Sequence, residues 1–181
     1  WASCGFASCS VRPTRSTGHL PAGPLPLAER QMKAVRLVAH NFRSLQHADI
    51  ELENYSLLVG PNNSGKSNLL AAVRVFYEKD LKYEDERDFS KHPAEDGECW
   101  VELEYECTPE EFEQLKEEYR LPERRFKVRK YLRSKAKDDE GKVRTGIYAY
   151  VNGELSGSRF YGAKNVQQGK LGDVIFVPAV S

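Results

Sequence analysis

The chain has 181 residues, and its 27 basic and 27 acidic side chains give a formal net charge of +0. This length allows about one domain, and the balanced charge does not favour a polyanionic partner for the chain as a whole. The four histidines lack metal-ligand spacing, and the longest apolar run near the end, VIFVPAV, is far shorter than a membrane span. We therefore expect a cytoplasmic protein without a side-chain metal cluster and without a membrane segment.

The first 31 residues precede the only methionine, Met32. They are rich in proline, glycine and serine and show no apolar period, which predicts a disordered leader or mistranslated upstream sequence. We expect folding to begin near Met32, so that residues 32–181 form the folded part.

The next residues predict a strand, a loop and a helix. Residues 33–42 and 48–54 alternate in polarity and predict two strands around a turn. The run YSLLV, residues 55–59, predicts a strand buried on both faces. After a polar loop, apolar residues recur at helical spacing from about residue 66 to residue 79.

The middle of the chain predicts an exposed connection and then a strand. Residues 78–98 are charged and lack a period, so we expect a surface segment where a partner could dock. Residues 99–107, CWVELEYEC, alternate with a period of two, which places Cys99 and Cys107 on the apolar face of a strand as core residues. Thr108, with Pro109 after it and Glu111 three residues later, predicts a capping box that opens a helix.

The last third predicts a small antiparallel sheet. Residues 124–137 form a basic strand, residues 143–151 return, and Asn152-Gly153 predicts a tight hairpin turn. The run DVIFVP, residues 173–178, predicts another buried strand.

The polar loop GPNNSGKS fits the pattern G-x-x-x-x-G-K-[ST] between the predicted strand and helix. Glycines let successive backbone N–H groups point inward, and the helix N-terminus adds positive charge, so the loop predicts a cradle for the phosphates of ATP. Lys66 would reach the terminal phosphates, and the Ser67 hydroxyl would bind Mg²⁺. The predicted nucleotide-binding residues of the loop are Gly60, Asn62, Asn63, Ser64, Gly65, Lys66 and Ser67.

Residues 35–70, VRLVAHNFRSLQHADIELENYSLLVGPNNSGKSNLL, resemble the amino-terminal half-lobe of ABC-type ATPases of the RecF, SMC and OLD groups. The shared features are the Asn-Phe-Arg-Ser turn and the cradle; Asp88-Phe89 and VIFVPAV look most like OLD-family endonucleases and RecF-like AAA proteins. The resemblance implies an α/β P-loop NTPase fold with a mixed sheet, a P-loop helix and an antiparallel β subdomain. It also implies that Arg43 lies near the phosphates, although a surface arginine remains the alternative.

The same resemblance implies parts that the sequence does not contain. A strand ending in Asp-Glu (Walker B), a signature loop contributed across a homodimer, and the Toprim nuclease domain of OLD proteins are absent from residues 32–181. We therefore expect an incomplete ATPase domain that binds ATP without completing its hydrolysis. DNA is the partner that the family implies.

The basic strand has two interpretations. Eight of its fourteen residues are Lys or Arg and none is acidic, and strand alternation places Arg125, Lys127, Arg129 and Arg133 on one face with Tyr131. That row resembles a surface that follows the DNA backbone. A solvated edge strand, kept from pairing by its charge, is the alternative.

Two other functions remain open. A small P-loop kinase would use Arg124, Arg125 and Arg129 as a lid over the transferred phosphate. A module without enzymatic activity would bind DNA or a partner under the control of the nucleotide, and whether DNA binding changes with ATP would distinguish it.

Overall fold

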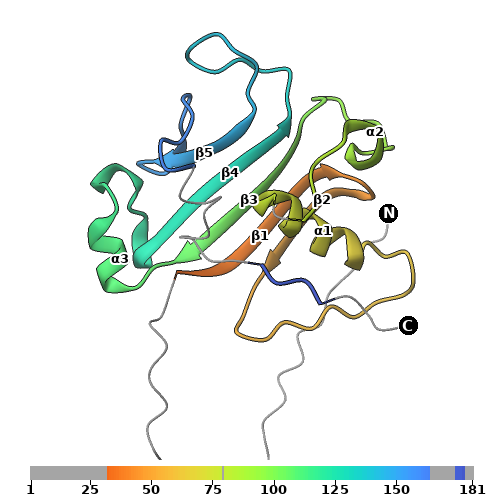
Figure 1. The fold of residues 1–181 in the computed structure, drawn as a ribbon, viewed down its shortest axis with the longest axis horizontal. Coiled ribbons are helices and arrows are strands. Elements are labelled where there is room, and N and C mark those ends of the chain that lie inside the picture. The colour runs from red at the N-terminus through yellow and green to blue at the C-terminus, as the bar shows by residue number, and fades with distance from the viewer. Residues whose placement is uncertain (1–31, 79, 164–173, 178–181) are drawn as a thin grey trace, which may run out of the picture. The chain divides into compact units, whose positions relative to one another are not determined.

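A computed structural model describes residues 32–78, 80–163 and 174–177, all within the compact unit Gln31–Ser181 (Figure 1). Its strands are β1 (Lys33–Phe42), β2 (Leu45–Glu51), β3 (Cys99–Glu106), β4 (Arg125–Arg133), β5 (Gly146–Val151) and β6 (Glu154–Leu155). Its helices are α1 (Lys66–Tyr77), α2 (Asp85–Asp88) and α3 (Pro109–Gln114), with 3-10 turns η1 (Glu117–Tyr119) and η2 (Pro122–Arg124). The predicted leader, residues 1–31, lies outside the described residues.

The six strands form one sheet in the order β2-β1-β3-β4-β5-β6. Every pair of neighbours in this sheet is antiparallel, so the described residues do not show the mixed sheet that we expected. The predicted strand pairs around residue 43 and after residue 124 are confirmed, and they belong to the same sheet. Because β4 lies between β3 and β5, the alternative of a solvated edge strand is wrong.

Helix α1 lies across one face of the sheet, and α2 and α3 lie near opposite ends of β3 (Figure 1). The core lies between α1 and the sheet: Leu69, Val75 and Phe76 of the helix pack with residues of β3 such as Leu103, which is 0% exposed. The period of two in β3 is confirmed, since both of its flanking cysteines are buried and free.

The structure has the predicted capping box and the predicted hairpin turn. Thr108 Oγ1 accepts a hydrogen bond from the Glu111 N–H, and the Glu111 carboxylate accepts one from the Thr108 N–H, which completes the capping box at the start of α3. Asn152 and Gly153 have φ values of 52° and 87°, and they join β5 to β6 as a hairpin. Both features depend on residues within a few positions of each other.

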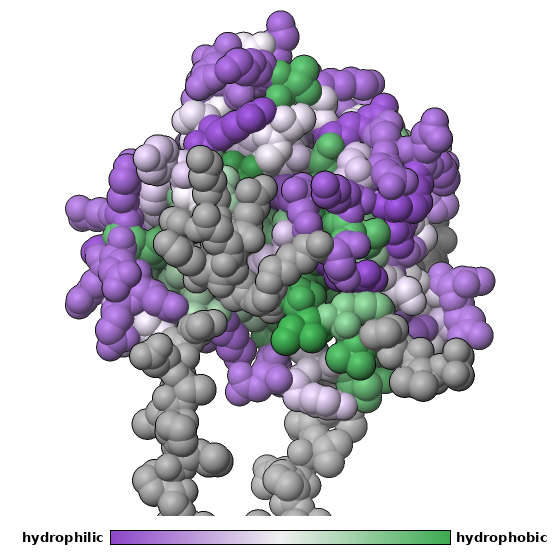
Figure 2. Space-filling model, viewed as in Figure 1, coloured by the Kyte–Doolittle hydropathy of each residue, from purple (hydrophilic) through white to green (hydrophobic). Residues whose placement is uncertain are grey.

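The prediction of two buried apolar strands at residues 55–59 and 173–178 is wrong for the residues that the structure describes. Residues 56–59 and 174–177 have no regular secondary structure and do not belong to the sheet. Leu58 and Val174 pack against the core, whereas Leu57 and Ile175 are 69% and 86% exposed. A strand is buried on both faces only where other layers of the protein cover both faces. Figure 2 shows apolar side chains at the surface, below the position of α1 in Figure 1. No helix among the described residues has the length and apolar character to span a membrane.

The segment that we expected to be an exposed connection, residues 78–98, is partly built into the fold. It contains the short helix α2, and Asp88 and Ser90 are buried. The Arg43 N–H donates to the Asp88 carbonyl at 2.7 Å, and a bridge joins Phe42 to Phe89. The charged composition of this segment predicts exposure. A charged side chain such as Asp88 can be buried when it is paired, and its partner Arg43 is distant in sequence, so the sequence alone did not indicate these contacts.

Candidate phosphate-binding site

The predicted phosphate loop lies at the surface between the segment after β2 and α1. Residues 60–64 are exposed, whereas Gly65 is buried. Asn63 and Gly65 have left-handed φ values of 63° and 92°, and the Ser64 N–H donates to the Pro61 carbonyl at 3.3 Å. The loop therefore doubles back before the helix begins, as a concave anion site requires.

The first turn of α1 is open to a ligand. Its N-cap is Gly65, and no side chain caps this turn. The amides of Asn68 and Leu69 bond to the Gly65 carbonyl at 2.9 and 3.0 Å, while the Ser67 side chain is exposed on the same turn. An uncapped helix N-terminus of this length carries partial positive charge and favours an anion.

Lys66 folds over the loop. Its Nζ donates to the carbonyls of Gly60 and Pro61 at 2.8 and 2.7 Å and to Ser64 Oγ at 3.2 Å. These acceptors are neutral, so a phosphate oxygen could replace them without breaking an ion pair. A charged acceptor would also form the stronger hydrogen bond.

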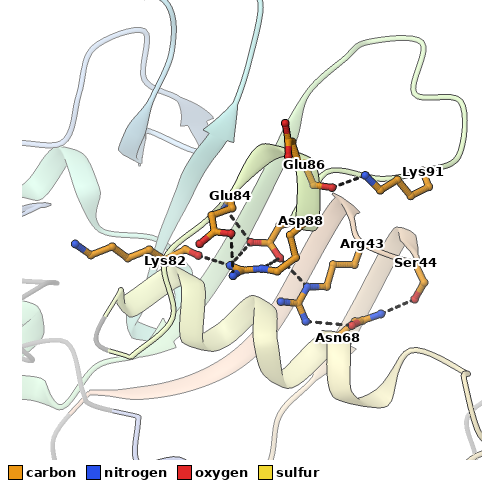
Figure 3. Close-up of polar contacts among 9 residues, drawn as sticks. Arg43, Ser44, Asn68, Lys82, Glu84, Glu86, Asp88 and Lys91 are labelled. Atoms are coloured by element: carbon orange, nitrogen blue, oxygen red, sulfur yellow. Dashed lines mark hydrogen bonds and ion pairs between the residues drawn. The ribbon is translucent and has the colours of Figure 1, made fainter.

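Arg43 lies beside the first turn of α1, and its guanidinium contacts protein groups. Nε donates to Asp88 Oδ1 at 2.8 Å, and Nη1 lies 3.5 Å from Asn68 Oδ1. Asn68 Nδ2 donates to Ser44 Oγ at 2.7 Å. Figure 3 shows these residues linking the turn after β1, the segment at α2 and the start of α1. We did not predict Asp88, Asn68 or Ser44 as site residues, although Asn68 directly follows Ser67.

The carboxylate of Asp88 is fully buried and fixed by several donors. Besides Arg43, it accepts hydrogen bonds from Arg87 at 2.9 and 2.7 Å and from the Glu84 N–H at 2.9 Å. Burial alone would raise the pKa of Asp88, but the hydrogen bonds from Arg87, Glu84 and Arg43 lower it to about 2. Asp88 is therefore a charged anchor and is unsuited to accept a proton as a general base.

The predicted basic row is paired within the chain. Lys127 and Arg129 both contact Glu102 at 2.8 Å, and Arg125 lies 4.0 Å from Glu104. A register shift between β3 and β4 takes Arg133 out of the row, and Arg133 contacts Asp85 at 2.7 Å. Tyr131 remains beside Arg129.

The structure does not bring this row to the phosphate loop. Lys130, between Lys127 and Arg133 on β4, points to the helix side and donates to the carbonyls of Val75 and Phe76 at the end of α1. Since successive side chains of a strand point to opposite faces, Lys127 and Arg129 lie on the other face of the sheet. Arg124, the remaining member of the kinase alternative, ends η2 before β4 begins.

The described residues hold no group of three or more His, Cys, Asp or Glu side chains placed to bind a metal ion. At the loop, the Ser67 hydroxyl is the one predicted metal ligand. A cation there would need oxygens supplied by a bound nucleotide.

Comparison with known proteins gives the family. Residues 32–171 match the AAA ATPase domain family. Two relatives from Actinobacillus pleuropneumoniae, serotype 5b (strain L20) and serotype 3 (strain JL03), are each named DNA replication and repair protein RecF. Each is 49% identical over 43 residues, which are 23% of this chain and 12% of the relative.

A solved structure of the recombination mediator protein RecF-ATP in the RecFOR pathway is 19% identical, with a TM-score of 0.42. That similarity covers 75% of this chain and 30% of the solved chain. The chain therefore matches only a small part of the length of these relatives.

The family match extends over more than half of the chain and includes the loop, α1 and all six strands. It agrees with the loop-to-helix geometry and with the resemblance predicted from the Asn-Phe-Arg-Ser turn and the cradle. The chain belongs to the AAA ATPase domain family and has a P-loop NTPase fold.

Proposed function

We propose that this chain is the ATP-binding part of a RecF-like ATPase that acts on DNA in the cytoplasm, and that it binds Mg·ATP at the loop before α1. The observation that carries the proposal is the exposed loop that ends in left-handed Gly65, directly before a helix whose first turn has no side-chain cap. This arrangement presents backbone N–H groups and positive charge to a phosphate.

The loop, Lys66 and Ser67 have different roles in the proposed site. The loop from Gly60 to Gly65, with Asn62, Asn63 and Ser64, supplies the cradle. Lys66 exchanges its carbonyl acceptors for phosphate oxygens. The exposed hydroxyl of Ser67 takes one coordination position on Mg²⁺, and phosphate and water take the others.

Lys66→Ala should remove most of the stabilisation that ATP gives. With Mg·ATP at about 100 times its Kd, a protein that binds only in the folded state gains about 2.7 kcal/mol. We expect a clear rise in the thermal midpoint of the unchanged chain and little rise in the variant, measured by differential scanning fluorimetry. Lys142→Ala is the matched control, because Lys142 is 68% exposed and pairs only with Glu140 among the ion pairs of the described chain. An equal rise in Lys66→Ala would place the nucleotide elsewhere.

The names of the relatives support a role in DNA repair, and the resemblance at Asp88-Phe89 supports the finer proposal of an OLD-type protein with phage-defence or nuclease function in a longer chain. RecF relatives also support DNA as a partner. A homodimer of the ATPase domain belongs to the same proposal. Whether ATP changes DNA binding tests the role without relying on turnover.

The basic row should contribute little to DNA affinity. Four free cations on duplex DNA would give a slope of log affinity against log salt of about −3.6, at about −0.9 for each contact. Because Glu102 already pairs with Lys127 and Arg129, we expect the double variant Lys127→Gln, Arg129→Gln to change that slope by less than one contact. Fluorescence anisotropy with a labelled duplex over a salt series measures it. A loss of about two contacts would establish the row as the DNA surface, and no DNA binding by the unchanged chain would refute the DNA part of the proposal for these residues.

A further inference from the structure

Asp88 connects the segment at α2 to the turn after β1. Its carboxylate binds Arg43 Nε, and its backbone carbonyl accepts from the Arg43 N–H at 2.7 Å. Directly after Asp88, a bridge joins Phe89 to Phe42, and the Ser90 N–H donates to the Asn41 carbonyl at 3.0 Å. Both the side chain and the backbone of Asp88 therefore fix this turn.

The residues after β1 also hold the first turn of helix α1. Asn68 lies between Arg43 Nη1 at 3.5 Å and Ser44 Oγ at 2.7 Å. A Cβ on Gly65 would lie 2.8 Å from Leu45 Cδ2, so the chain at the start of the helix packs directly on the same turn. Asn68 adjoins Ser67, and these contacts hold the part of α1 that faces the loop.

We propose that Asp88 is a positioning residue for nucleotide binding, which acts through Arg43 and Asn68 to hold the first turn of α1 against the turn after β1. The inference rests on the proposed binding of Mg·ATP at the loop. It gives Arg43 a second role besides its expected place near the phosphates: its side chain transmits the position of a buried carboxylate to the helix.

The effect of losing this carboxylate follows from its surroundings. Asparagine at position 88 would keep the shape but lose the charge, and its NH2 group would face N–H donors at either oxygen position: Arg43 and Arg87 at Oδ1, or Arg87 and the Glu84 N–H at Oδ2. In either orientation Arg43 loses its charge-assisted hydrogen bond to the carboxylate and is held less firmly toward Asn68. Small displacements of binding groups weaken ligand contacts disproportionately, because each contact depends on a narrow range of distance.

Asp88→Asn should weaken Mg·ATP binding about tenfold, by analogy with the loss of residues that orient metal ligands. Isothermal titration calorimetry on the folded chain, verified by circular dichroism, measures the Kd. Asp85→Asn is the matched control: Asp85 lies in the same short helix and also pairs with an arginine, Arg133, but among the described residues its side chain bonds to neither Arg43 nor α1. Its Kd should stay close to that of the unchanged chain.

Asn68→Ala provides a second route that leaves the buried ion pairs intact. It cuts the link to α1 and should weaken Mg·ATP binding to the same extent as Asp88→Asn. Because the two residues act in one chain of contacts, the double variant should bind no more weakly than either single variant. An unchanged Kd for Mg·ATP in Asn68→Ala would overturn the proposal. So would an Asp88→Asn protein that is less stable but, once folded, binds Mg·ATP with an unchanged Kd.

Hydrogen exchange separates this inference from the proposed function. In the nucleotide-free chain, Asp88→Asn should speed exchange at the amides of Asn68 and Leu69, which bond to the Gly65 carbonyl, whereas Asp85→Asn should not. If the unchanged chain binds no Mg·ATP, the proposed function is wrong. Independently of that result, equal exchange rates at these amides in the two variants would refute the positioning role of Asp88.

Discussion

Gly65→Ala is expected to abolish measurable ATP binding and to lower the free energy of unfolding by about 2 kcal/mol, since a left-handed backbone costs an L-residue about 1–2 kcal/mol before any clash. Gly65 has φ +92°, and a Cβ there would lie 2.8 Å from Leu45 Cδ2 and 3.4 Å from Ser44 Oγ. Relief of that contact requires either the Leu45 side chain, which belongs to the buried core, or the backbone at Gly65 to shift. A shift at Gly65 displaces the N-terminus of α1 at the proposed phosphate site.

Gly141→Ala is the matched control for this prediction. Gly141 has φ +79°, but a Cβ there would meet nothing within 4 Å. The two variants therefore share the backbone cost, and their difference in urea unfolding measures the contact with Leu45 and Ser44. We expect Gly141→Ala to bind ATP like the unchanged chain. Equal losses of stability and normal ATP binding in both variants would show that the close packing of Gly65 has no part in the site.

The local elements could be predicted from the sequence because their determinants lie close together in the chain. The turn into helix α1 needs only the glycines of the loop and the helix period that follows. The capping box needs Thr108 and Glu111, and the hairpin needs Asn152-Gly153. In each case the residue types at fixed short spacing determine the backbone, and the structure has the predicted feature.

The remaining features depend on pairing between distant residues. Arg43 and Asp88 are 45 positions apart, and Glu102 and Arg129 are 27 positions apart. No periodicity specifies such partners, so the sequence suggested neither Asp88 as the partner of Arg43 nor Glu102 as the partner of the cations of β4. The prediction of a buried strand at residues 55–59 was wrong for a related reason. Its apolar composition predicts burial, but burial requires other elements to cover it, and the run itself does not specify them.

The pairing of Glu102 explains why a strand with three cations on one face can lie inside the sheet. Its side chain is 4% exposed, and it accepts hydrogen bonds from Arg129 at 2.8 Å and from the Tyr150 hydroxyl at 2.6 Å, besides the contact with Lys127. The Arg129 guanidinium also lies 3.7 Å from the centre of the Trp100 ring. One buried carboxylate thus pairs with both cations at the centre of the basic row and offsets one of their two charges.

Glu102→Gln should therefore lower the free energy of unfolding by about 3 kcal/mol near neutral pH. This is the lower end of the range for breaking a buried ion pair, because the side chains of Lys127 and Arg129 remain 23% and 19% exposed and keep some solvation. Glu104→Gln is the matched control on the same strand and face, because its contact with Arg125 is 4.0 Å long and both side chains are partly exposed. We expect it to cost less than about 1 kcal/mol in urea unfolding.

The cost of Glu102→Gln should also depend on pH. Burial would raise the pKa of Glu102, but hydrogen bonds from Lys127 and Tyr150 and the charge of Arg129 hold it below its ordinary value of 4.5. A depressed pKa in the folded state stabilises the protein above the unfolded pKa, and this contribution disappears as the pH falls through the folded pKa. The difference between the unchanged chain and Glu102→Gln should therefore be constant above pH 4.5 and shrink below it. A difference that stays the same in acid would show that the loss comes from packing, and that the charge of Glu102 does not hold Lys127 and Arg129 in the sheet.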